Sequence, residues 1–187
     1  MSIKKILLLS LLACCLPFKL AHAIGPADQP SWGQFEHDFE EKPWSELEAR
    51  LPPPPKQENL LPFYVSAESN NRFFIDSESI LPGTDGIVRY TLVILSASGA
   101  RNVSFEGMRC ATSEFKRYAF GREDGSWGRA KNIQWSSIQY KDTNRQHHML
   151  FDDFLCPRGF PVKNREEAIQ AFKAGIHFNA RADTIPH

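Results

Sequence analysis

Two cysteines, Cys110 and Cys156, constrain the fold of this chain more than any other residues. The other two cysteines lie in an N-terminal apolar stretch that has the form of a secretory signal. Removal of that stretch would leave one pair in an oxidising compartment, where paired cysteines ordinarily form a disulfide. The bond would close a loop of about 46 residues and stabilise the fold by roughly 4 kcal/mol. The alternative, a catalytic thiol, needs a nearby base and an unpaired cysteine.

The chain begins MSIKKILLLSLLACCLPFKLAHAIG. Two lysines precede an apolar run, and Ala21-His22-Ala23 places small residues where a signal peptidase reads them. We therefore predict a signal peptide over residues 1–23, cleavage after Ala23 and a periplasmic location. The segment LLAC leaves an alternative open, a lipoprotein anchored to the membrane through Cys14.

The predicted mature chain has a weakly acidic balance. Removing the signal removes three lysines and no acids, so 19 basic residues remain against 22 acidic ones. Nucleic acid is therefore not an expected partner, because its binding depends on clustered positive charge. No other stretch reaches about 18 unbroken apolar residues. We expect a soluble protein, or one in peripheral contact with a membrane, whose partner is an unknown envelope component or protein.

Residues 24–60 are expected to form an acidic, proline-rich N-terminal arm. They hold eight acidic residues and three basic ones. Ser45 and Glu48 have capping-box spacing, which predicts a short helix, and the prolines at 52–55 would end it. The favoured interpretation is that the arm lies on a basic face of its own domain; the alternative is a separate partner.

Residues 61–187 are expected to form a single α+β domain. Apolar and polar residues alternate as in strands, with Gly- and Pro-containing turns between them. A run that is apolar on both faces, residues 87–98, is the candidate central strand. The predicted architecture is an antiparallel sheet of about four to six strands, covered by C-terminal helices and closed by one disulfide. The strand candidates are 63–67, 71–80, 87–98, 102–110 and 114–123.

Two helices are predicted in the C-terminal third. The first ends at Pro157 and carries an apolar face. The second begins after Asn164, a good N-cap, and ends near Gly175, a plausible C-cap. The apolar face of the first helix comprises Leu150, Phe151, Phe154 and Leu155.

The stretch HHMLFDDFLC has the residue types of a metal or catalytic site, but its spacing argues against both. Adjacent residues on a helix point about 100° apart, so neither the HH nor the DD pair can converge on one ion. His148 and Asp152, four residues apart, supply two ligands where zinc needs three or four. We expect an exposed pair there, and no metal, cofactor or catalytic residue. The chain also lacks the HExxH and GxSxG motifs.

Residues 101–131 hold seven basic residues against four acidic ones, interleaved with aromatic residues. Lys116, Arg117 and Arg122 are the candidate residues of an anion-binding or partner surface. The alternative is the solvated face of a strand pair.

The stretch MRCATSEFKRYAFGREDGSWGRAKNIQWSSI, together with the later FLCP, resembles the cryptic neisserial protein 1-like family. The resemblance covers roughly residues 32–157 and places Cys110 and Cys156 at the two cysteine positions of the family. It implies an exported protein of Gram-negative bacteria with no established activity. The favoured interpretation is a non-catalytic binding or structural domain of the cell envelope. The alternative is a hydrolytic enzyme that acts on envelope polymers.

Overall fold

The computed structural model describes residues 43–139 and 145–180. The predicted signal peptide, its cleavage after Ala23, the Cys14 alternative and most of the acidic arm lie outside these residues. The chain divides into two compact units, Met1–Pro43 and Trp44–His187, and the second contains the fold described here.

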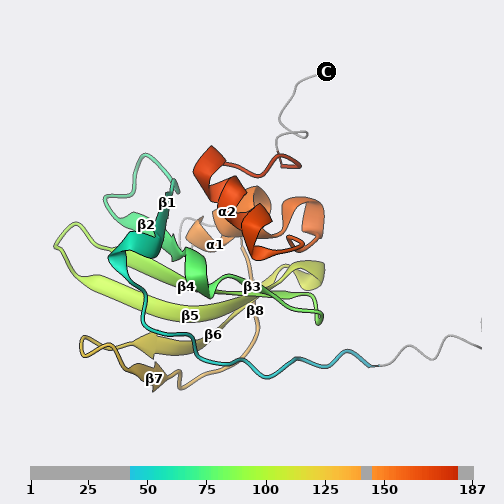
Figure 1. The fold of residues 1–187 in the computed structure, drawn as a ribbon, viewed down its shortest axis with the longest axis horizontal. Helices are drawn as coiled ribbons and strands as arrows, with labels where there is room; N and C mark the ends of the chain where they lie inside the picture. Colours follow the sequence, from blue (N-terminus) through green and yellow to red (C-terminus); the bar gives the residue numbers. More distant parts are fainter. Residues whose placement is uncertain (1–42, 140–144, 181–187) are drawn as a thin grey trace, which may run out of the picture. The chain divides into compact units, whose positions relative to one another are not determined.

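An antiparallel sheet of eight strands forms the body of this unit. Six strands follow one another in the order β1-β2-β4-β5-β6-β7, while β3 pairs with β4 and β8 pairs with β6 (Figure 1). The prediction of an antiparallel sheet is confirmed, but the predicted number of strands, four to six, was too small. The missed strands β3, β7 and β8 are only two or three residues long, too short for an alternating pattern. The strands are β1 (Leu60–Phe63), β2 (Arg72–Asp76), β3 (Leu81–Pro82), β4 (Ile87–Leu95), β5 (Arg101–Arg109), β6 (Glu114–Gly121), β7 (Trp127–Arg129) and β8 (Ser136–Ser137).

Strand β4 is central, as its sequence predicts. It lies between β2 and β5 and pairs with β5 along its whole length, from Ile87 opposite Arg109 to Leu95 opposite Arg101. Its first seven residues are buried. Apolar side chains on both faces of a strand require cover on both sides of the sheet.

Helices cover one face of the sheet (Figure 1). Their apolar core packs on β1, β2 and β4 and includes an aromatic cluster of Phe63, Phe154 and Phe172. The four apolar residues predicted to share one helical face are all buried there. The helices are α1 (Arg145–Met149), the π-helix η5 (Leu150–Leu155), the 3₁₀ turn η6 (Pro157–Gly159) and α2 (Arg165–Ala174).

Both ends of α2 follow the predicted capping. The side chain of Asn164 accepts a hydrogen bond from the backbone N–H of Glu167, and Gly175 adopts a left-handed conformation with φ of 80°. A left-handed residue is costly for any side chain with a Cβ, which explains the glycine at this position.

The predicted disulfide between Cys110 and Cys156 is present. The two sulfurs are 2.04 Å apart and the Cα atoms 5.4 Å apart. Cys110 begins the turn η4 (Cys110–Thr112) after β5, and Cys156 directly follows η5. The bond therefore joins the sheet to its helical layer, and neither sulfur is available as a nucleophile.

The predicted short helix at Ser45–Glu48 is wrong. Residues 43–56 form neither helix nor strand. The side chain of Glu46, inside the expected helical turn, instead bonds to groups of the sheet 70 and 72 positions away. These tertiary bonds outweigh the weak helical preference of a short segment followed by four prolines.

Candidate functional site

The second face of the sheet is crossed by the chain's own N-terminal segment. We call residues 44–56 the strap. Glu46 is its main anchor, because its carboxylate accepts hydrogen bonds from Lys116 Nζ at 2.7 Å, Tyr118 OH at 2.9 Å and Trp135 Nε1 at 3.3 Å. Burial raises the pKa of Tyr118 above its usual value, and the bond to Glu46 adds to this shift. Tyr118 therefore stays protonated and donates.

A buried ion pair holds the strap backbone beside Glu46. Arg89 donates to Asp85 at 2.7 Å and to the carbonyl of Leu47 at 2.7 Å, while the N–H of Leu47 donates to Asp85. Burial alone would raise the pKa of Asp85, but the bonds from Arg89 and Leu47 lower it. The paired charges thus satisfy both backbone groups of Leu47.

Aromatic residues fix both halves of the strap. The indole of Trp44 lies 4.1 Å from the Arg109 guanidinium, and Trp127 Nε1 donates to the carbonyl of Pro52 at 2.8 Å. Arg101 donates to the carbonyl of Pro55 at 3.2 Å. This part of the acidic arm therefore lies on its own domain.

On the helix-covered face, Glu106 of β5 is fully buried and forms the centre of a polar cluster. It receives hydrogen bonds from Ser104 Oγ at 2.8 Å, Tyr90 OH at 3.2 Å and Arg117 Nε at 3.0 Å, and His147 Nε2 lies 2.8 Å from it. Burial alone would raise the pKa of Glu106, but His147, Arg117 and Ser104 lower it to about 2. The carboxylate is therefore ionised at neutral pH.

His147 is the second buried member of this cluster. Its ring stacks on Phe115 with centroids 3.8 Å apart, and neither His147 nor Glu106 exposes side-chain surface to solvent. The Nδ1 atom of His147 has no hydrogen-bond partner among the described residues. Both side chains are thus shielded from bulk solvent, and the pair holds its neighbours in place through the bonds to Glu106.

Arg117 is the member of the cluster that reaches the surface. Its Nε is bound to Glu106, its guanidinium carbon lies 5.0 Å from the centre of the Phe115 ring, and its side chain is 35% exposed. Its two terminal amino groups form no hydrogen bond within the described part of the chain. The buried carboxylate therefore fixes a guanidinium whose outer edge can still bind an anion.

Two cavities meet at Arg117 and Phe120. The larger, of about 480 Å³, is also lined by Arg129 and Lys131. The smaller, of about 300 Å³, is also lined by Arg101 and Glu106. We call the two cavities together the cationic groove. The rest of the lining is uncharged apart from Glu106 and is partly apolar. Its polar side chains are Asn132, Gln134 and Ser136 in the larger cavity, and Asn102, Ser104 and Gln146 in the smaller; its apolar ones include Phe115 in the larger cavity and Leu92, Ile94 and Val103 in the smaller.

The structure does not bring Lys116, Arg117 and Arg122 onto one surface. Successive strand residues point to opposite faces, so Lys116 meets the strap while Arg117 meets Glu106 on the other side. Arg122 braces the β6–β7 hairpin by donating to Ser126 Oγ at 3.1 Å and to the carbonyl of Trp127 at 3.0 Å.

Sequence reasoning missed the residues that accompany Arg117 in the groove. Arg129 and Lys131 belong to the basic run 101–131, but nothing in their spacing links them to Arg117 across the sheet. Glu106 was missed as well. The residue pattern contained no clear signal for it: Val103 and Phe105 were expected to point inward, which placed Glu106 on the polar face, whereas the structure buries both faces of β5.

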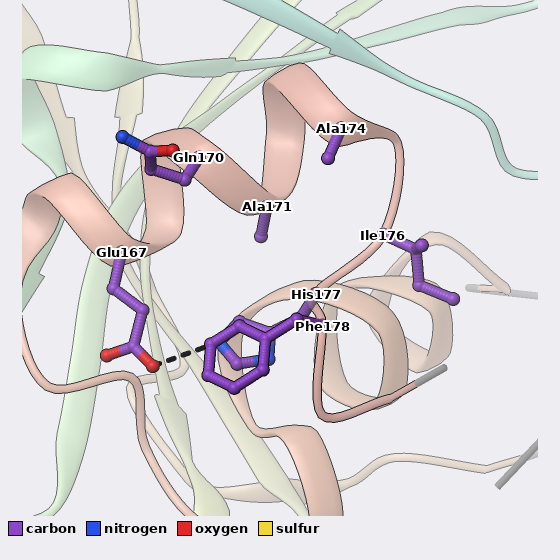
Figure 2. A pocket seen from close by; sticks show the side chains of 7 residues that line it. All are labelled: Glu167, Gln170, Ala171, Ala174, Ile176, His177 and Phe178. Atoms are coloured by element: carbon purple, nitrogen blue, oxygen red, sulfur yellow. Dashed lines mark hydrogen bonds and ion pairs between the residues drawn. The ribbon is translucent and has the colours of Figure 1, made fainter. Parts of the chain in front are cut away.

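A further cavity, of about 310 Å³, lies beside α2 (Figure 2). His177 Nε2 lies 3.0 Å from Glu167, and His177 Nδ1 accepts the N–H of Asn179. Since Nδ1 accepts, Nε2 is the donor to Glu167. Glu167 also accepts the N–H of Lys163. The pair therefore fixes both ends of α2 and serves packing.

The HHMLFDDFLC stretch contains the expected i,i+4 pair, with His148 Nδ1 3.0 Å from Asp152. The pair is half-buried rather than exposed, because the neighbouring apolar residues of η5 pack into the core. Within residues 43–139 and 145–180, no group of three or more His, Cys, Asp or Glu side chains is placed to hold a metal ion. In the same residues, no helix has the length and apolar character needed to cross a bilayer.

The fold and the site define a class: a disulfide-closed α+β domain whose antiparallel sheet carries helices on one face and its own strap on the other. The chain belongs to the CNP1-like family, whose model matches residues 39–173. It is 28% identical over 149 residues to cryptic neisserial protein 1 of Neisseria gonorrhoeae (strain ATCC 700825 / FA 1090). The matched region covers 70% of this chain and 73% of that protein. No solved structure matches the chain. The matched names state no activity, and the hydrolytic alternative finds no support in them.

Proposed function

We propose that this protein is an exported, periplasmic, non-catalytic domain of the cell envelope that binds an anionic ligand in the cationic groove. The observation that carries the proposal is Arg117, which is held from behind by the buried Glu106 and open in front to both cavities. An arginine whose position is set before binding loses little side-chain entropy when an anion arrives.

Export is supported by the disulfide and by the N-terminal sequence. A bond between Cys110 and Cys156 persists in an oxidising compartment and is rare in the cytosol. The apolar stretch that ends at Ala23 has the pattern of a cleaved signal.

A binding role is favoured because the two acid–histidine pairs with a buried histidine have structural contacts. Glu106 and His147 are inaccessible, and Glu167 and His177 hold the ends of α2. The groove, by contrast, offers basic side chains with no acceptor in the described chain. Arg129 and Lys131 are exposed and form no hydrogen bond or ion pair there.

The export part is tested on protein recovered by osmotic shock. We expect intact-mass measurement to find a chain that begins at Ile24 and contains no free thiol. A chain found in the cytosol with two reactive thiols would contradict export. A diacylglyceryl-modified Cys14 would contradict cleavage after Ala23 and support membrane anchoring.

The binding part is tested by titrating orthophosphate into the mature, oxidised chain and measuring heat. We expect saturable binding that weakens as salt is raised, because exposed charges are screened. Arg117→Gln should weaken it at least tenfold, since a charge-assisted pair is lost. Lys173→Gln, which removes one charge from the exposed side of α2, is the matched control and should bind like the native chain. Equal binding by both variants would remove the groove from the proposal.

A further inference from the structure

We infer that the ligand of the cationic groove is an oligosaccharide with at least two phosphate groups, one in each cavity. This inference rests on the proposed function and names the chemistry of its ligand. It follows from the charge of the groove, from the position of Arg117 between the cavities and from their neutral lining.

The charge of the groove exceeds what one simple anion can neutralise. Four cationic side chains line it, and Glu106 is the carboxylate among its lining residues. Glu106 is already paired with Arg117, which leaves an excess of three positive charges. A phosphate monoester carries about −1.5 to −2 charges at neutral pH, so two phosphates match the excess. The four cations are Arg101, Arg117, Arg129 and Lys131.

The cations are divided between the two cavities, with Arg117 shared. Arg129 and Lys131 belong to the larger cavity, and Arg101 belongs to the smaller. An anion in the larger cavity can meet three cations there, but it leaves Arg101 without a counter-charge. A second anionic group on the same molecule would occupy the smaller cavity. Linked groups bind more tightly than separate ones, because the second contact becomes intramolecular.

The mixture of uncharged polar and apolar side chains in the remaining lining suits a sugar better than a bare polyphosphate. Carboxamide and hydroxyl side chains in both cavities can donate to and accept from sugar hydroxyls. Phe120, 47% exposed, lies at the junction of the cavities and offers an apolar ring to one face of a sugar. A bare polyphosphate would leave this ring and these amides without a partner.

The inference is tested by titrating four probes into the mature, oxidised full chain. The probes are orthophosphate, tripolyphosphate, a disaccharide with a phosphate on each sugar, and the same disaccharide without phosphates. We expect the bisphosphorylated disaccharide to bind at least tenfold more tightly than orthophosphate and more tightly than tripolyphosphate. The unphosphorylated disaccharide should not bind measurably.

Two charge variants then distinguish one cavity from two. Arg129→Gln should weaken both orthophosphate and the bisphosphate about tenfold, the effect of losing one charge-assisted contact. Arg101→Gln should weaken the bisphosphate about tenfold and leave orthophosphate within twofold. Arg101 also bonds to Pro55, so unfolding curves must show that this variant remains folded. Lys173→Gln again serves as the charge control.

The outcomes separate this inference from the proposed function. Equal affinity for orthophosphate and the bisphosphate, with no effect of Arg101→Gln, would overturn the two-phosphate inference and leave the groove as an anion site. Tightest binding by tripolyphosphate would overturn the sugar component. Absence of binding by every phosphate probe would overturn both proposals.

Discussion

Replacement of Glu106 by Gln is the most direct test of the buried network behind Arg117. The substitution keeps the size of the side chain and removes its charge. The pKa of Glu106 falls from an ordinary value of 4.5 to about 2 in the folded protein. At about 1.4 kcal/mol per pKa unit, this shift corresponds to roughly 3 kcal/mol of folding free energy. Because Arg117 is 35% exposed and partly screened, we take this as an upper figure.

The stabilisation by Glu106 has a defined pH window. Its folded-state pKa lies below the unfolded-state value, so the stabilisation is complete above pH 4.5 and is lost as the pH falls towards 2. We therefore expect Glu106→Gln to reduce the free energy of unfolding at pH 7 by at most about 3 kcal/mol. The difference between the two proteins should shrink steadily below pH 4.5. Urea unfolding followed by tryptophan fluorescence measures it.

A matched control is Glu68→Gln. Glu68 also pairs with an arginine, Arg145, at 3.3 Å, but its side chain is 83% exposed. An exposed pair contributes little, so this variant should unfold like the native chain at every pH. A difference between Glu106→Gln and the native chain that stayed constant from pH 7 to pH 3 would refute the ionised state assigned to Glu106.

Three further predictions concern the parts that hold the fold together. Replacing Cys110 and Cys156 by alanine should lower the free energy of unfolding by about 4 kcal/mol, measured in urea against the oxidised native chain. Gly107→Ala should destabilise the protein by about 1–3 kcal/mol, because the new Cβ would lie 2.6 Å from Tyr118 OH; thermal unfolding measures this. Glu46→Gln should speed hydrogen exchange and protease cleavage in the strap while the sheet keeps its protection, since three bonds to the sheet weaken together.

The long, regular parts of the fold could be predicted from the sequence. Strand β4 is apolar on both faces, and α2 has caps at both ends, so local chemistry agrees with the final structure. Strands β3, β7 and β8 could not be predicted. Each is defined by its hydrogen bonds to a longer neighbouring strand. A run of two or three residues is too short to show the alternation of apolar and polar residues by which strands are recognised.

The candidate site was predicted only in part, because the sequence does not show which residues of one strand lie opposite which residues of the next. Arg117 was selected for its charge, but its partner Glu106 is identified only by the pairing of β5 with β6. Lys116 was selected for the same reason and lies on the other face, bound to Glu46. The short helix expected at Ser45–Glu48 was wrong because the conformation of this segment depends on acceptors and donors far along the chain.

The strap also imposes an order on assembly. Its contacts with Asp85 and Trp135 join residues 41 and 89 positions apart. Translation delivers Trp44 and Glu46 first, yet their docking surface exists only after β4, β5 and β6 have paired. Contacts between such distant residues form slowly, because closing the large loop between them costs conformational entropy before the contacts contribute any stabilisation. The earliest part of this domain to be synthesised is therefore the last to reach its native place, and until then Lys116, Tyr118 and Trp135 stand open to any acidic segment nearby.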